Sequence, residues 1–276
     1  MMVWQWAVLL ALVCLLYVPI LGRLAAQWWT DPNFSHGFFV PAFSAFIVWQ
    51  ERARLRLIQP APSNWGLPII VFSLGILILG VFGAELFLSR MSLLVLIGGM
   101  IVFFLGWQML REVLFPLLLL ILMVPIPAIV FSQITFPLQI LASKLATWSL
   151  AFLGVPVFRE GNVINLPAMP LEVAEACSGI RSLLSLTTLA IMYGYLMEKR
   201  PLLRVVLAVA SVPIAVAANA LRIVGTGLLV QYWDPDKAEG FFHAFSGWLI
   251  FVVSLLMLFL LHRSLTPLFK RREASA

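Results

Sequence analysis

Of the chain's 276 residues, 62% are hydrophobic and only 11% are charged. Soluble globular domains carry about 25% charged residues, so the composition excludes a water-soluble protein and indicates an integral membrane protein. The net charge of +6 does not indicate a nucleic-acid partner, because the basic residues stand beside apolar segments and form no stripe with exposed aromatic residues. Two cysteines, Cys14 and Cys177, exclude a disulfide framework and a cysteine-rich metal site.

Nine apolar segments follow one another along the chain, and a helix needs about 20 apolar residues to cross a bilayer. They cover residues 3–22, 34–50, 67–83, 91–107, 113–131, 134–154, 180–197, 205–224 and 245–261. This spacing leaves no room for a separate soluble domain, so residues 1–276 are predicted to form a single polytopic membrane domain.

Basic residues between the segments indicate which loops face the cytoplasm, because such loops are enriched in Lys and Arg. The basic clusters are Arg52, Arg54 and Arg56; Lys199, Arg200 and Arg204; and Arg263, Lys270, Arg271 and Arg272. Segments alternate sides, so the first cluster puts the N-terminus inside. Nine spans would then put the second cluster outside, which predicts that one segment does not span.

Segment 134–154 is the predicted exception. Thr135, Gln139, Ser143 and Thr147 recur every four residues, with Lys144 beside them, and so give one helix face a polar character. We predict that this helix lies in the outer interface. The alternative is a true ninth span whose polar residues face the bundle interior. The predicted fold is therefore an all-α integral membrane protein with about eight transmembrane helices, one outer interfacial helix and both termini inside.

The loop at 155–176 is predicted to lie outside and to contain a small hairpin. Glu160, Gly161 and Asn162 form a turn signal between short alternating runs. The loop leads into Cys177, after which a long apolar helix begins. A cysteine at a helix N-terminus has a lowered thiol pKa, which suits a nucleophile. The alternative is a small buried apolar side chain, which is the expected role of Cys14 within the first segment.

Arg222 and His243 are predicted to reach the same membrane face as Cys177. An arginine inside an apolar span is costly and so indicates a functional site; it would stabilise an oxyanion or a thiolate. The alternative is a side chain that extends to the outer headgroups. His243 has the chemistry of an acid and base near neutral pH, or else it is an interface residue.

Other polar residues on this face have weaker support. His36 is either a second acid/base or a cap, and Glu172 and Glu175 are candidates to orient His243 or to pair with Arg222. The sequence contains no H-E-x-x-H spacing and no G-x-S-x-G motif. No metal and no organic cofactor is therefore expected.

Three blocks resemble the signatures of the exosortase/archaeosortase family. They are Glu-Ala-Cys-Ser-Gly-Ile-Arg-Ser at 175–182, Asn-Ala-Leu-Arg at 219–222 and Phe-His-Ala-Phe-Ser-Gly-Trp at 242–248. The early Ser-His-Gly-Phe at 35–38 looks like a further family feature. The resemblance maps the family's nucleophile, arginine and histidine onto Cys177, Arg222 and His243. The possible supporting residues are Glu175, Ser178, Arg181, Asn219 and His36.

The resemblance implies a cysteine transpeptidase or protease of the bacterial inner membrane, with its active site facing the periplasm. Its expected partners are membrane lipid and secreted proteins with a C-terminal Pro-Glu-Pro (PEP) motif, an apolar helix and a basic tail. Family members occur mainly in bacteria that make exopolysaccharide. Neither the residues nor the resemblance identifies the acceptor nucleophile, the subtype or the oligomeric state.

Two rival functions belong to other classes. A transporter would use Arg222 to bind an anionic solute, and it predicts polar groups near mid-membrane on several helices. A membrane acyltransferase would use a thiol or a histidine on a lipid-linked substrate. Dependence on a peptide sorting signal separates the exosortase interpretation from both.

Overall fold

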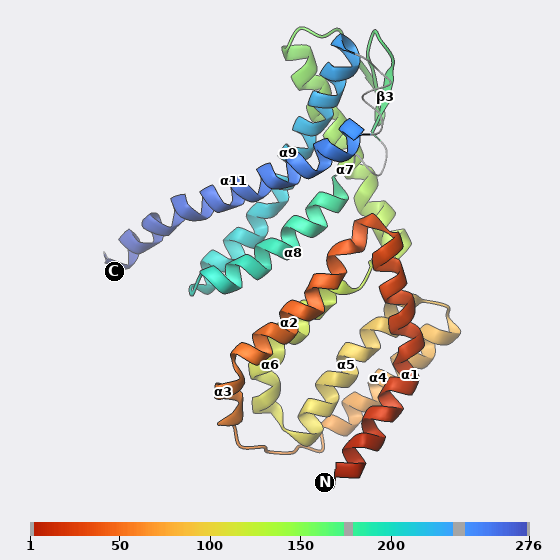
Figure 1. Ribbon diagram of the computed structural model, residues 1–276, viewed down its shortest axis with the longest axis vertical. Helices are drawn as coiled ribbons and strands as arrows, with labels where there is room; N and C mark the ends of the chain where they lie inside the picture. Colours follow the sequence, from red (N-terminus) through yellow and green to blue (C-terminus); the bar gives the residue numbers. More distant parts are fainter. Residues whose placement is uncertain (1–2, 174–178, 234–240, 275–276) are drawn as a thin grey trace. The chain divides into compact units, whose positions relative to one another are not determined.

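The computed structural model describes residues 3–173, 179–233 and 241–274, which form two compact units, residues 1–128 and 129–276 (Figure 1). Helices dominate both units, and the strands of the described chain all lie in the second. The all-α membrane class is therefore confirmed, with one small sheet added to it.

Unit 1 consists of helices joined by short links. Its elements are α1 (Val3–Thr30), η1 (Pro32–Phe38), α2 (Phe39–Gln50), α3 (Arg52–Arg56), α4 (Gly66–Phe82), α5 (Leu86–Phe104), α6 (Trp107–Leu119) and η2 (Leu120–Met123). A three-residue link makes α4 and α5 an antiparallel hairpin. The Tyr17 hydroxyl lies 2.9 Å from Ser92 Oγ and connects α1 to α5, and Tyr17 packs in an apolar cluster with Leu77, Leu93 and Leu96.

The predicted segment 113–131 is not one helix, and that prediction is wrong. Helix α6 ends at Leu119, η2 adds one turn, and α7 begins at Ala128. Pro125 and Pro127 stand in the gap. Proline has no backbone N–H and disfavours the helical conformation of the residue before it, so two prolines this close end the helix. Phe131 therefore belongs to α7.

Unit 2 contains four long helices and a sheet in its described residues. The helices are α7 (Ala128–Phe152), α8 (Ile180–Met197), α9 (Pro201–Tyr232) and α11 (Phe241–Ala274), and the strands are β1 (Phe158–Glu160), β2 (Val163–Asn165) and β3 (Pro170–Glu172). The strands pair antiparallel in the order β1-β2-β3. Gly161, with φ +60°, makes the turn between β1 and β2. The turn signal at 160–162 thus corresponds to a real hairpin, which β3 extends.

The polar face of α7 is buried rather than exposed. Thr135, Gln139 and Ser143 are 2%, 9% and 0% exposed, and Ser143 Oγ donates to the Gly161 carbonyl at 3.2 Å. These side chains therefore face protein, as the alternative to an interfacial helix requires. Farther along α7, Ala146 and Leu150 enter an apolar core that the sheet and α9 complete.

Six helices in the described residues are long and apolar enough to cross a membrane. They cover Ala11–Thr30, Leu86–Phe104, Ala128–Phe152, Ile180–Met197, Pro201–Tyr232 and Gly247–Pro267, and the shorter apolar helix Gly66–Phe82 joins them. A multi-pass membrane protein follows from these lengths. The count of eight spans and the side of each loop stay predictions.

Candidate functional site

The proposed nucleophile, Cys177, lies outside the described residues, as do Glu175 and Ser178. The structure describes the chain on both sides of them. β3 ends at Glu172, and α8 begins at Ile180 with Gly179 at its N-cap. The predicted helix start just after Cys177 is therefore present.

Gly179 brings the start of α8 against α9. Its φ is +79°, and a Cβ at this position would lie 2.9 Å from Cγ of Asn219. Residues other than glycine rarely adopt this backbone conformation, and a Cβ here would collide with the side-chain amide of Asn219. Asn219 is 2% exposed on α9. The chain that follows Cys177 and Ser178 thus passes directly beside the Asn219 block.

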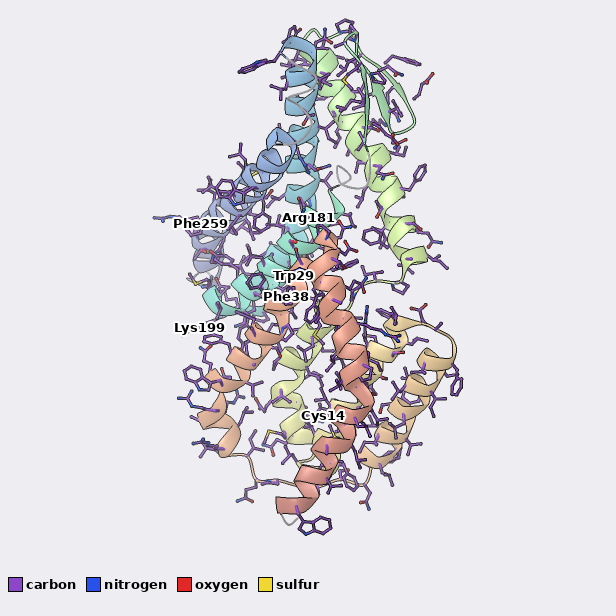
Figure 2. All side chains as sticks on the ribbon, turned by 45° about the vertical axis from the view of Figure 1, so that its right-hand side comes forward. Cys14, Trp29, Phe38, Arg181, Lys199 and Phe259 are labelled. Carbon is purple, nitrogen blue, oxygen red and sulfur yellow. The ribbon has the colours of Figure 1, made fainter. Side chains whose placement is uncertain are left out.

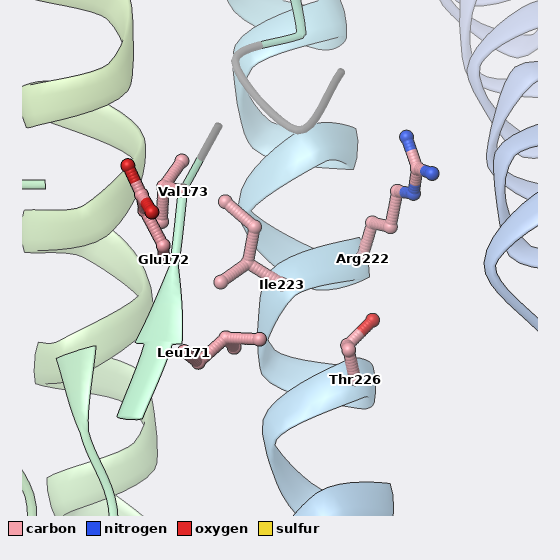
Figure 3. A pocket seen from close by; sticks show the side chains of 6 residues that line it. All are labelled: Leu171, Glu172, Val173, Arg222, Ile223 and Thr226. Carbon is pink, nitrogen blue, oxygen red and sulfur yellow. The ribbon is translucent and has the colours of Figure 1, made fainter. Parts of the chain in front are cut away.

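Arg222 lies three residues beyond Asn219 on α9 and is half-buried. It lines a small pocket, together with Leu171, Glu172, Val173, Ile223 and Thr226. Figure 3 shows the β3 residues of this pocket on one side of Ile223, whereas the Arg222 guanidinium extends on the other side, toward α11. A Cβ at Gly247 of α11 would lie 3.5 Å from its Nη2 atom.

His243 belongs to α11, four residues before Gly247. Residues four apart in an α-helix share one face, so His243 and Gly247 occupy the same side of α11, and Gly247 is the residue next to Arg222. The His243 side chain is outside the described part of the structure. What the backbone establishes is that the second and third sequence blocks adjoin at Arg222.

His36 and Arg181 have different surroundings. His36 lies in unit 1, where its Nε2 is 3.2 Å from the Leu122 carbonyl, so it connects η1 to η2. Arg181 is exposed in the first turn of α8. Figure 2 labels Arg181 and also Cys14 on α1. Cys14 is exposed, so the expectation that it packs inside the protein is wrong.

Two sources of positive charge stand at the sequence blocks. The N-terminus of α8 presents the positive end of its dipole near the segment that contains Cys177. Arg222 adds a permanent cation with donors in a fixed fork, at a half-buried position beside a pocket. Among the described residues, no group of three or more His, Cys, Asp or Glu is placed to hold a metal ion.

Sequence reasoning missed two glycines and one arginine. Gly179 and Gly247 stand inside the signature blocks, but only the structure shows that each lies against a side chain of α9. Arg90, in α5, is 3% exposed. The sequence contains a signal for Arg90, because this arginine is the single charged residue in the apolar run at 86–104.

Comparison with protein-family models gives a match to the transmembrane exosortase model over residues 28–260, which is most of the chain and includes parts of both units. No curated protein and no solved structure matches the chain.

Proposed function

The chain belongs to the transmembrane exosortase family, and on that premise we propose that it is a membrane-embedded cysteine transpeptidase that cleaves C-terminal sorting signals of secreted proteins. The substrate carries a PEP motif, an apolar helix and a basic tail. Cleavage takes place at the periplasmic face of a bacterial inner membrane, with both termini of the enzyme in the cytoplasm.

In the proposed reaction, the Cys177 thiolate attacks the scissile carbonyl carbon. The carbonyl oxygen gains negative charge, which the Arg222 guanidinium stabilises. As the intermediate collapses, the C–N bond breaks and His243 gives its proton to the departing amine. A thioester remains on Cys177. His243 then takes a proton from the acceptor nucleophile, which attacks the thioester and frees the thiolate.

The observation that carries this proposal is the meeting of three sequence blocks on one turn of α9. Gly179, two residues after Cys177, lies against Asn219, and Gly247, one turn after His243, lies against Arg222. Asn219 and Arg222 differ by about 4.5 Å along the helix axis. A segment about 40 residues before Asn219 therefore adjoins Asn219, and a segment about 25 residues after Arg222 adjoins Arg222. In sequence, the first segment follows the thiol and the second follows the imidazole.

The test is cleavage of a tagged substrate bearing a PEP signal, co-expressed with the wild-type protein, with Cys177→Ala or with Cys177→Ser. Wild type should shorten the substrate, and both variants should reduce the rate by at least about 10³-fold, because the covalent step needs a thiolate. Cys14→Ser is the matched control, since it removes the other thiol, and it should cleave like wild type. Membrane abundance of every variant is measured by immunoblot.

Trapping separates the mechanism from its rivals. Hydroxylamine should release the acyl group from wild type as a hydroxamate at the C-terminus of the shortened product, and it should release none from Cys177→Ala. Cleavage that persists without the thiol contradicts the mechanism. Absence of cleavage by wild type, with several PEP signals, contradicts the substrate assignment and favours a transporter in which Arg222 binds an anion.

A further inference from the structure

A hydrogen-bonded cluster joins α8 to α11 at the end of these helices far from Arg222. The Tyr193 hydroxyl lies 2.8 Å from Nδ1 of His262, and the two rings meet edge to face, with centroids 5.3 Å apart. Nε2 of His262 lies 3.5 Å from Oε2 of Glu198. The histidine and glutamate side chains are 13% and 11% exposed. We refer to Tyr193, His262 and Glu198 as the clamp.

Glu198 is held in its charged form. Burial raises the pKa of its carboxyl group, but hydrogen bonds from the Arg200 amide, His262 and the Lys199 amide outweigh burial and lower the pKa. A carboxylate only accepts hydrogen bonds. His262 therefore donates from Nε2 to Glu198, and with a neutral ring its other nitrogen, Nδ1, accepts from the Tyr193 hydroxyl.

The clamp lies where apolar packing defines the helix positions poorly. Helices α8 and α11 both pack along α9 and touch each other over a shorter stretch. Leu189, Val252, Leu255 and Leu256 line an apolar groove between them, which Tyr193 borders. Apolar helix faces in a membrane have no hydrophobic driving force to associate, because lipid is as apolar as they are, and interhelical hydrogen bonds add to the packing that holds them together. The clamp thus selects one register of α8 against α11.

The same two helices carry the proposed catalytic residues at their other ends. Helix α8 has 18 residues from Ile180 to Met197, or about 27 Å at 1.5 Å per residue. It begins just after Cys177 and ends just before Glu198. In α11, His262 follows His243 by 19 residues, which is about 28 Å along the axis. A shift of either helix at the clamp therefore moves its catalytic end.

We propose that Tyr193, His262 and Glu198 are positioning residues that fix α8 against α11 and thereby align Cys177 with His243. This inference rests on the proposed function for its catalytic consequence, but the register of the helices is testable without any substrate. A misplacement of about 1 Å costs up to about 10²-fold in rate, so loss of the clamp reduces kcat and leaves the affinity for substrate unchanged.

The register is measured by disulfide cross-linking in membranes, in a full-length Cys14→Ser, Cys177→Ser background. Leu189→Cys is combined in turn with Val252→Cys, Leu255→Cys and Leu256→Cys. The three pairs should cross-link at unequal rates when the clamp is intact. Tyr193→Phe removes a single oxygen atom, and it should change the ratio of the fastest to the slowest rate by at least about threefold, as expected when a register is lost.

Tyr195→Phe is the matched control, because it makes the same chemical change two residues away. Tyr195 belongs to the same helix but not to the clamp, and its ring lies under the Arg204 guanidinium at 4.9 Å. It should leave the three cross-linking rates as they are. Equal rate ratios in Tyr193→Phe, His262→Gln and the control would overturn the clamp.

The effect of the clamp on catalysis is measured with the native cysteines in place and with the PEP substrate. Tyr193→Phe should lower kcat about tenfold with KM within twofold of wild type, and Tyr195→Phe should change neither. A rise in KM alone contradicts a positioning role. If wild type cleaves no substrate but the cross-linking ratios shift, the proposed function fails and the clamp stands. If wild type cleaves and the ratios do not shift, the function stands and the clamp fails.

Discussion

Each compact unit contains an arginine inside an apolar helix, and the two arginines differ in burial and in their neighbours. Arg90 in unit 1 is 3% exposed, and its Nε and Nη2 atoms have no hydrogen-bond partner among the described residues. Arg222 in unit 2 is half-buried, borders a pocket and lies against Gly247. Both incur the cost of a charge in an apolar helix. The two arginines therefore differ in exposure and in neighbours, and a costly arginine by itself does not identify a site.

Between the two arginines, the larger effect is expected from replacing the guanidinium of Arg222. Arg222→Lys keeps the charge but loses the paired donors, and it should lower the rate of PEP-signal cleavage by about 10²- to 10³-fold, as removal of an oxyanion donor does. Cleavage per molecule in membranes is the measurement, with Arg90→Lys as the matched control. A similar loss of rate in both variants would break the distinction between the two arginines.

Gly179 tests the close approach of α8 to Asn219 in unit 2. Gly179→Ala has to adopt φ near +79° and puts a methyl group 2.9 Å from Cγ of Asn219. The backbone strain alone costs about 1–2 kcal/mol, and the collision moves the start of α8. We expect at least about a tenfold loss of cleavage rate and an altered rate of alkylation of Cys177 by iodoacetamide.

Gly225→Ala is the control for that substitution, because nothing lies within 4 Å of a Cβ at this position of α9. It should leave both the cleavage rate and the alkylation rate unchanged. An equal response of Gly179→Ala and Gly225→Ala would show that the approach of α8 to Asn219 is irrelevant to the thiol.

In unit 1, the expected effects concern stability rather than turnover. A Cβ at Gly80 would lie 2.5 Å from Oγ of Ser89 on α5. Gly80→Ala should therefore lower the free energy of unfolding in micelles by about 1–3 kcal/mol, as overpacking does, without changing cleavage per folded molecule. Gly75→Ala on the same helix α4 meets nothing within 4 Å and should be neutral. A loss of turnover in Gly80→Ala would instead place α4 and α5 in the catalytic machinery.

The smallest effect is expected at Arg90 itself. Arg90→Met removes a buried cation with two unsatisfied nitrogens and replaces it with an apolar side chain of similar length. The exchange removes the cost of burying a charge but also the electrostatic attraction of Glu85, so the free energy of unfolding should change by no more than about 1 kcal/mol. Thermal unfolding in micelles measures it. Strong destabilisation would mean that the attraction between Arg90 and Glu85 outweighs the cost of burying the guanidinium.

Several elements were predictable because their signals are local. The helix at 180–197 matches α8 at both ends, since a glycine precedes it and a charged run follows it. The turn at Gly161 was predictable from residue types alone. The break within 113–131 also has a local signal, because Pro125 and Pro127 stand in it. Hydropathy alone does not register that signal, since proline interrupts a helix without making the segment polar.

Other features have no local signal. Thr135, Gln139 and Ser143 show that one face of α7 is polar. A polar face of this kind suits either a membrane interface or a protein neighbour. The hydrogen bond from Ser143 to Gly161 shows that this face contacts protein. His262 stands among apolar and basic residues, which give no sign of its partners. Its partners Tyr193 and Glu198 come from the other side of a helix pair, 69 and 64 residues away.

The membrane environment, the residue types available for chemistry and the family follow from the sequence alone, because composition and contiguous blocks are properties of the chain. The folded structure is needed to show which glycine contacts which side chain, which arginine borders a pocket and which end of α8 is hydrogen-bonded to α11. Those facts depend on approaches of a few ångströms between helices far apart in sequence, and in an apolar medium many helix arrangements satisfy the same hydropathy pattern.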